Sequence, residues 1–367
     1  MLVHSHPTQS IRIDESSGQV FVIDQRRLPF DFMEVELKTA HDAFIAIRDM
    51  VVRGAPLIGV TAAFGFFLGL RDHQNIKEIQ QYMDDLAGML KSARPTAVNL
   101  EYAVNRLSGK LQGAPRDSLA RLAFEEARQI YEEELDRSRS IGFHGLKLIQ
   151  DIHEKKMGET VNVLTHCNAG WLACIDYGTA LAPVYEAWNN GIPVHVWVDE
   201  TRPRNQGARL TVWELKQHGI PCTLITDNAG GHLMQKGKVD LVIVGTDRTA
   251  MNGDVVNKIG TYQKALAAFD NNIPFYVAAP STSIDPLLSN GNEIVIEERD
   301  GNEIRFIEGV RSGKTESLRI CPVHTAVSNP GFDLTPARLI NGLITERGVC
   351  NASREGILGL FEEWKSK

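Results

Sequence analysis

Hydrophobic and polar positions divide the chain into two differently patterned parts. Residues 11–24 alternate apolar and polar side chains around a Ser-Gly pair, which predicts a β-hairpin, and residues 33–39 predict a further strand. From Ala40 onward the apolar residues recur at helical spacing. The helices predicted from this spacing cover residues 40–51, 75–91, 99–111 and 116–148, the last divided by a break at 140–145 into a long helix and a shorter one.

The second part of the chain alternates short apolar runs with segments that are compatible with helices. Three of the runs open with Ile-Pro after Gly or Asn, which predicts a helix end, a turn and a new strand. The predicted strands are 161–165, 192–198, 220–226, 239–245 and 273–279. Because helices separate apolar strands, we expect βαβ units and a parallel sheet that is covered on both faces.

These two patterns together predict an α/β protein with two domains. The length of 367 residues fits two domains. The pattern changes within residues 125–158, where the domains should meet.

Composition and charge exclude several classes of protein. The net charge of −7 gives no general attraction to nucleic acid or to an anionic membrane, although a small anionic substrate remains possible. The five cysteines show no CxxC spacing, so we expect neither a disulfide framework nor a structural zinc site. The N-terminus does not resemble a signal peptide, and the apolar stretch 60–70 is too short to span a bilayer. We therefore expect a cytoplasmic protein with no nucleic-acid or membrane partner.

Residue types suited to chemistry follow four of the predicted strands. Ligands bind open parallel sheets beyond the carboxyl ends of the strands. The polar segments at these ends are 165–170 (THCNAG), 199–210, 227–231 and 246–261. Four converging segments favour an active site over solvated connections.

Cys167 and Asp247 are the candidates for acid–base chemistry. Cys167 follows a strand at a predicted helix start, where the helix dipole would favour a thiolate that acts as base or nucleophile. The alternative is a buried structural cysteine. Asp247 ends a strongly apolar strand, and partial removal from water would suit a carboxyl group to act as an acid. The alternative there is a helix cap or a salt-bridge partner. His166 is a weaker candidate, because neighbouring side chains at a strand end point to opposite faces.

Three cationic residues lie at predicted helix starts, where free backbone N–H groups favour anions. Lys258 falls in the first turn of a helix predicted to start at 254–257. Arg53 precedes Gly54-Ala55 and an apolar helix, and Arg94 precedes Pro95 at another helix start. Each of them alone is more often a surface residue, but together they indicate a phosphate site.

Cofactor motifs do not occur in the sequence. No GxGxxG follows a strand, no GxxxxGK[ST] occurs, and no HExxH or clustered His/Asp set indicates a metal. We therefore expect neither a nucleotide cofactor nor a metal.

Several motifs closely resemble one family of aldose 1-phosphate isomerases. They are RGAPLIGV, RPTAVNL, THCNAG, DETRPRNQGARLTVWEL, GTDRTAMNGDVVNKIGT and NPGFDLTPARLINGLITERGV. The family includes methylthioribose-1-phosphate isomerases of methionine salvage, ribose-1,5-bisphosphate isomerases and the regulatory subunits of eukaryotic translation initiation factor two B. The resemblance runs from Ile11 to Gly348. It implies a mostly helical N-terminal domain (1–135), a Rossmann-like C-terminal domain (136–367) and a homodimer.

The resemblance also implies a reaction and a set of site residues. The family's catalytic pair falls on Cys167 and Asp247. Its substrate contacts fall on Arg53, Gly54, Ala55, Arg94, Gln206, Asn257 and Lys258. The implied reaction converts 5-methylthioribose 1-phosphate to 5-methylthioribulose 1-phosphate. Asp247 would manage the proton of the ring oxygen, and Cys167 would take the C2 proton, with a direct hydride shift as the alternative.

Other functions remain open at this point. The substrate of such an isomerase could instead be 5-deoxyribose 1-phosphate or ribose 1,5-bisphosphate. An apolar pocket separates a methyl from a methylthiomethyl group by only about 1–3 kcal/mol. A non-catalytic regulatory subunit and an NAD-dependent dehydrogenase are the remaining alternatives.

Overall fold

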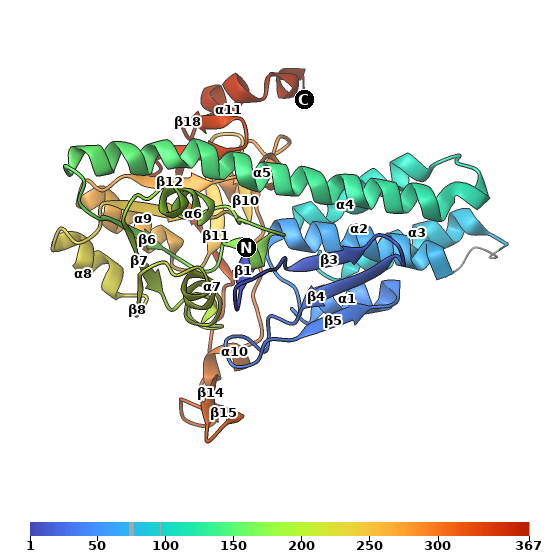
Figure 1. Cartoon of the computed structure of the whole chain (residues 1–367), viewed down its shortest axis with the longest axis horizontal. Helices are drawn as coiled ribbons and strands as arrows, with labels where there is room; N and C mark the ends of the chain where they lie inside the picture. Colours follow the sequence, from blue (N-terminus) through green and yellow to red (C-terminus); the bar gives the residue numbers. More distant parts are fainter. Residues whose placement is uncertain (73–76, 96, 367) are drawn as a thin grey trace.

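The chain forms an α/β structure with a helical N-terminal part and a mostly parallel C-terminal sheet, as the pattern predicted. Figure 1 shows the computed structural model, in which residues 1–72, 77–95 and 97–366 are described. The helical part and the sheet lie next to each other along the longest axis, and the helix α5 runs across both (Figure 1).

The N-terminal part combines a small antiparallel sheet with a helical bundle. Its strands are β3 (Ile11–Asp14), β4 (Gln19–Ile23) and β5 (Glu34–Leu37), preceded by the short pair β1 (Leu2–Val3) and β2 (His6–Pro7). Its helices are α1 (Ala40–Arg48), α2 (Ala55–Asp72), α3 (Ile79–Ser92) and α4 (Val98–Leu111). These elements confirm the predicted hairpin, strand and helices, although the predicted helix start at Asn75 lies outside the described residues.

Helix α2 lies at the centre of this bundle. Its glycines allow neighbouring helices to approach: a Cβ on Gly59 would lie 2.9 Å from the Asn99 carbonyl oxygen, and one on Gly65 would lie 2.6 Å from Ala43 Cβ. The helix has 18 residues and is apolar enough to cross a membrane by length and composition, so the length argument from residues 60–70 was wrong. Because 83% of it is buried inside the fold, it is a core helix of this protein.

Helix α5 (Leu119–Lys155) is one continuous element of 37 residues. The predicted break at 140–145 is therefore wrong. Gly142 and Gly145 lie where α6 (Ala182–Asn189) packs against α5, and a Cβ on Gly145 would lie 2.9 Å from Pro183 Cβ. The small residues serve a close helix contact, which a sequence pattern cannot distinguish from a helix end.

The main sheet has seven strands in the order β18-β17-β12-β9-β6-β7-β8. All neighbouring pairs are parallel except β17 and β18. The strands are β6 (Val161–Thr165), β7 (Val194–Asp199), β8 (Cys222–Ile225), β9 (Leu241–Val244), β12 (Phe275–Ala278), β17 (Gly342–Thr345) and β18 (Gly348–Cys350). The chain passes outward from β6 to β7 and β8, then returns to β9 on the other side of β6. The strand order therefore reverses between β6 and β9, where doubly wound sheets bind ligands.

The five predicted strands of this sheet are confirmed, and helices connect them as expected. These helices are α6, α7 (Val212–Gln217), α8 (Ala229–Gln235) and α9 (Thr261–Asp270), and α11 (Arg354–Leu360) follows β18. The helix α5 contacts β6, β17 and β18 on one side of the molecule (Figure 1).

A second sheet has the order β13-β10-β11-β16, with strands β10 (Arg248–Ala250), β11 (Val255–Lys258), β13 (Ile284–Asp285) and β16 (Phe332–Thr335). Strand β11 replaces the helix that was predicted to start at 254–257, so that prediction was wrong. Val255 and Val256 are buried and β-branched, and β11 is paired on both sides by β10 and β16. Burial and pairing favour the strand over a solvated helix start.

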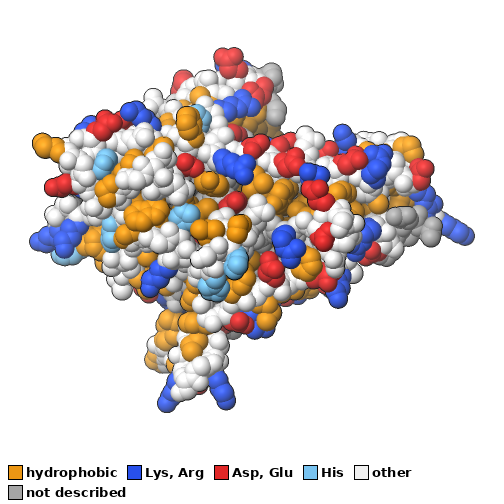
Figure 2. All heavy atoms as spheres, in the orientation of Figure 1, with side chains coloured by type: hydrophobic (Ala, Val, Ile, Leu, Met, Phe, Trp, Pro, Cys, Tyr) orange, Lys and Arg blue, Asp and Glu red, His pale blue; other side chains and the backbone are white. Residues whose placement is uncertain are grey.

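A hairpin of β14 (Phe306–Arg311) and β15 (Lys314–Arg319) projects from the body after the short α10 (Asn302–Arg305) (Figure 1). Figure 2 shows apolar side chains along this projection and basic side chains at its tip, whereas charges of both signs are mixed over the rest of this face.

Candidate active site

One cavity of about 320 Å³ lies beyond the carboxyl ends of β6 and β9 and is closed on the other side by residues from α2 and the segment before α4. All nine site residues that the family resemblance implied line it. They are Arg53, Gly54, Ala55, Arg94, Cys167, Gln206, Asp247, Asn257 and Lys258. Both parts of the chain therefore contribute to a single cavity.

Cys167 is held by three hydrogen bonds. Its backbone N–H donates to Thr201 Oγ1 (2.8 Å), its carbonyl accepts from Thr211 Oγ1 (2.7 Å), and its thiol donates to Gln206 Oε1 (3.2 Å). Its φ of 66° lies in the left-handed region, which a non-glycine residue adopts only when its surroundings enforce it. The two threonines supply that enforcement and fix the direction of the thiol.

No helix begins at Cys167, so the argument from a helix dipole was wrong. A single 3₁₀ turn follows at Trp171–Ala173, and α6 begins only at Ala182. Burial raises the pKa of the Cys167 thiol, while the nearby charges of Arg53 and Lys258 act in the opposite direction. At neutral pH the thiol is therefore protonated and acts as a hydrogen-bond donor.

Asp247 follows β9, and Cys167 follows the neighbouring strand β6. Its backbone N–H donates to the Val256 carbonyl at 3.0 Å, which ties the residue to β11. The side chain is half-buried and lines the cavity. A carboxyl group and a thiol thus emerge from adjacent strands at the reversal of strand order.

Four cationic side chains line the same cavity, namely Arg53, Arg94, Lys258 and Arg248, the last of which is paired with Asp285. Arg94 is mostly buried, and burial lowers its pKa, although the charges of Asp247 and Glu297 favour its protonated form. Burial also lowers the pKa of Lys258, whose ammonium donates to the Gly331 carbonyl at 3.0 Å. With Arg53, these groups make the cavity suited to a phosphate dianion.

Arg53 is oriented by a side chain from the loop that carries Cys167. Its Nη1 donates to Asn168 Oδ1 at 2.6 Å. A guanidinium has five N–H donors, so this contact leaves others for a ligand in the cavity. Arg94 lies just before α4 as predicted, whereas Thr96 of the same motif lies outside the described residues.

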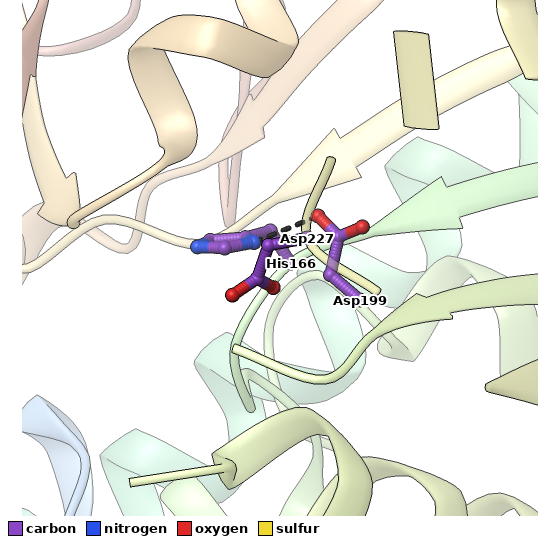
Figure 3. A group of neighbouring side chains, drawn as sticks. All are labelled: His166, Asp199 and Asp227. Atoms are coloured by element: carbon purple, nitrogen blue, oxygen red, sulfur yellow. Dashed lines mark hydrogen bonds and ion pairs between the residues drawn. The ribbon is translucent and has the colours of Figure 1, made fainter. Parts of the chain in front are cut away.

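A buried charged group lies behind Cys167. Figure 3 shows His166, Asp199 and Asp227, whose potential ligand atoms lie within 4.8 Å of one another. An ammonium already occupies this group, because Lys264 Nζ lies 3.1 Å from Asp199 Oδ2 and donates to the Asp227 carbonyl.

The histidine of this group has no nitrogen left for a metal. His166 Nδ1 faces Asp199 Oδ2 (2.8 Å), and its Nε2 faces the Ile259 carbonyl (2.8 Å). Both ring nitrogens therefore face oxygen atoms of the protein. We therefore interpret the group as an anchor between the loops after β6, β7 and β11.

Sequence reasoning missed the residues that support the site. Thr201, Thr211 and Glu214 are buried, and with Asn168 they hold the Cys167 loop in place. They occur within the motifs THCNAG and DETRPRNQGARLTVWEL. The one sequence signal for these supporting residues was the glutamate within the mostly apolar segment TVWEL. A carboxyl group that is fully buried requires hydrogen-bond partners.

The chain was then compared with known proteins. The model of the Initiation factor 2 subunit family matches residues 51–352. The methylthioribose-1-phosphate isomerase of Sinorhizobium medicae (strain WSM419) is 55% identical over 366 residues, which cover 99% of this chain and 100% of that protein.

Two solved structures have a similar fold over nearly the whole chain. The 5-methylthioribose 1-phosphate isomerase of Pyrococcus horikoshii OT3 has a TM-score of 0.83 and 37% identity, covering 97% of this chain and 96% of that one. The structure described as translation initiation factor eIF-2B, subunit delta, from A. fulgidus has a TM-score of 0.81 and 38% identity, covering 97% and 100%. Fold similarity alone therefore does not separate an isomerase from a translation-factor subunit, whereas the relative at 55% identity carries the isomerase name.

Proposed function

The chain belongs to the Initiation factor 2 subunit family, and from this premise we propose that it converts 5-methylthioribose 1-phosphate to 5-methylthioribulose 1-phosphate. It is an isomerase that interconverts an aldose and a ketose phosphate and serves methionine salvage. One observation carries this proposal. A thiol and a carboxyl group emerge from adjacent strands at the reversal of strand order, in a cavity whose lining includes Arg53, Arg94 and Lys258.

The cations account for binding of the phosphate. Arg53 and Arg94 come from the helical part, and Lys258 comes from β11, so a phosphate between them would join both parts of the chain. The guanidinium groups bind two phosphate oxygens at once, whereas the ammonium acts as a point charge. Gln206 and Asn257 line the same cavity and supply amide groups for the sugar hydroxyls.

The carboxyl group and the thiol account for the chemistry. The phosphate on C1 prevents spontaneous opening of the sugar ring, so the ring oxygen must receive a proton, which we assign to Asp247. Hydrogen must then move from C2 to C1, and the C2 hydroxyl must give up its proton to become the ketone carbonyl; the Asp247 carboxylate left by the first step is the acceptor that we assign to it. Because the buried thiol of Cys167 is protonated in the free protein, it has to lose its proton before it can act as a base.

A protonated thiol cannot accept the C2 proton, so it favours the hydride-shift route. In that route Cys167 only polarises the substrate by donating a hydrogen bond to it. The two routes differ in the fate of the C2 hydrogen. In deuterated water, retention of that hydrogen at C1 supports a hydride shift, whereas deuterium at C1 supports proton transfer through Cys167.

The lining of the cavity also contains apolar side chains, which suit a methylthio group. Its apolar lining includes Met50, Ile58, Val98, Leu288, Val295 and Phe332. A second phosphate in place of the methylthio group would lose hydration against these side chains, and the remaining cation of the lining, Arg248, is already paired with Asp285.

Turnover of three substrates tests the proposed function. We expect 5-methylthioribose 1-phosphate to give the highest kcat/KM. We expect 5-deoxyribose 1-phosphate to lose about 1–3 kcal/mol of binding at most and ribose 1,5-bisphosphate to be poor. Preference for the bisphosphate, or absence of turnover with all three, would contradict the proposal.

The same proposal includes the setting of the enzyme. It acts as a cytoplasmic homodimer, without a nucleic-acid or membrane partner. It has a helical domain at 1–135 and a Rossmann-like domain at 136–367, and its catalytic pair is Cys167 and Asp247. The reversed strand order supports the Rossmann-like description. Sedimentation of the purified protein tests the dimer.

A further inference from the structure

A buried carboxylate that does not reach the cavity is connected to it through one side chain. Glu214 lies in α7 and is fully buried. Its Oε1 accepts a hydrogen bond from Asn168 Nδ2 at 2.7 Å, and its Oε2 accepts one from the Leu172 backbone N–H at 3.2 Å. Asn168 Oδ1 in turn accepts the hydrogen bond from Arg53.

The direction of the Asn168 amide decides whether Arg53 is held or repelled. A guanidinium can only donate hydrogen bonds, so the amide must present its oxygen to Arg53. Its NH₂ group then has to find acceptors on the opposite side. Glu214 Oε1 and Thr211 Oγ1 (3.1 Å) are these acceptors.

We propose that Glu214 is a positioning residue that fixes the Asn168 amide so that its oxygen holds Arg53 ready for the substrate phosphate. This inference rests on the proposed function, because it takes Arg53 as a phosphate ligand. The carboxylate acts through two hydrogen bonds and does not touch the substrate.

Packing agrees with this role, and the hydrogen bonds to Glu214 oppose the effect of its burial. Burial raises the pKa of Glu214 to about 8, while the N–H groups of Leu172 and Asn168 and the charge of Arg53 favour the ionised form. Gly170 leaves the space that the carboxylate occupies, because a Cβ on Gly170 would lie 2.6 Å from Glu214 Oε2. A merely space-filling residue at this position would need neither the two donors nor the adjacent glycine.

Replacement by the isosteric amide provides the test. In Glu214→Gln the new amide would accept from Leu172 and turn its NH₂ group toward Asn168. Asn168 would then have to turn over and present N–H groups to Arg53. Because hydrogen bonds to charged groups contribute about 1.5–3 kcal/mol, we expect the Kd for inorganic phosphate and the KM for substrate to rise by about 10–100-fold. The kcat should remain nearly unchanged, since Arg53 binds the phosphate equally before and during the reaction.

A double variant separates positioning from simple support of the loop. Glu214→Gln combined with Asn168→Asp keeps the net charge and gives residue 168 one oxygen for Arg53 and one for the amide at 214. Phosphate binding should therefore recover. The matched control is Glu134→Gln, which neutralises another buried carboxyl, in α5, and should leave phosphate binding unchanged.

Calorimetry measures the binding of inorganic phosphate without any turnover, so the positioning role is tested separately from the proposed function. An unchanged phosphate Kd in Glu214→Gln, or no recovery in the double variant, would overturn the positioning role. If Glu214→Gln does not fold, Asn168→Ala breaks the same connection and should raise the phosphate Kd by a similar factor. Phosphate binding by a wild-type protein that turns over no sugar phosphate would overturn the proposed function and leave the positioning role standing.

Discussion

Gly54 is a residue at which one methyl group should disturb both stability and function. It lies between Arg53 and the start of α2 with φ of +94°, and a Cβ there would lie 2.5 Å from Ala173 Cα and closer still to the Ala173 carbonyl oxygen. The left-handed backbone costs a non-glycine residue about 1–2 kcal/mol. Overpacking against a backbone adds about 1–3 kcal/mol. We therefore expect Gly54→Ala to reduce the free energy of unfolding by about 2–5 kcal/mol.

Urea denaturation of Gly54→Ala measures this loss, and Gly109→Ala is the matched control. Gly109 lies within α4, and a Cβ there would meet nothing within 4 Å. This control should be more stable than the wild type by about 0.5–1 kcal/mol, because alanine is less flexible in the unfolded chain. Since the Gly54 substitution also moves Arg53, the KM for substrate should rise. Equal stability of the two variants would refute the account of the contact between Gly54 and Ala173.

Three further predictions concern the phosphate site, acid stability and metal dependence. Arg94→Gln should raise KM by about 10–100-fold with little change in kcat, because it removes a charged phosphate contact; steady-state kinetics measures both constants, and an unchanged KM would exclude Arg94 from the site. Although burial raises the pKa of Glu303, its hydrogen bonds to Arg299 and Arg204 lower it to about 2. The ionised Glu303 therefore contributes about 3 kcal/mol to the free energy of unfolding above pH 4.5, and this contribution is lost as the pH falls toward 2. The stabilities of the wild type and Glu303→Gln should therefore converge in acid denaturation. Treatment with EDTA should leave turnover unchanged, because Lys264 already occupies the anionic group of Asp199; loss of activity that zinc or magnesium restores would contradict this interpretation.

The sequence pattern predicted most of the fold, because burial periodicity reports which face of an element meets the core. The predicted strands that open with Ile-Pro are one example of a correct prediction. It failed at Gly145, where a small residue allows α6 to approach a continuous helix. It also failed at 254–258, where pairing with β10 and β16 decides for a strand. Both errors depend on contacts between segments that are distant in the sequence.

The candidate site could likewise be predicted only in part from the sequence. Cys167 and Asp247 could be found as reactive side chains after strands, and Arg53, Arg94 and Lys258 as cations near expected helix starts. The family resemblance added Gly54, Ala55, Gln206 and Asn257, and all nine line one cavity. The left-handed backbone of Cys167 and the connection from Glu214 to Arg53 could not, because each depends on hydrogen bonds across the fold. The raised pKa of Cys167 likewise follows from burial that the sequence does not show.

The measurement that tests the central claim most directly is turnover of 5-methylthioribose 1-phosphate by the wild type, Cys167→Ala and Asp247→Asn, with phosphate binding measured in each. The account predicts that each substitution lowers kcat by about 10²–10⁴-fold while the phosphate Kd stays close to that of the wild type. Turnover at the wild-type rate by either variant would contradict the assignment of the catalytic pair.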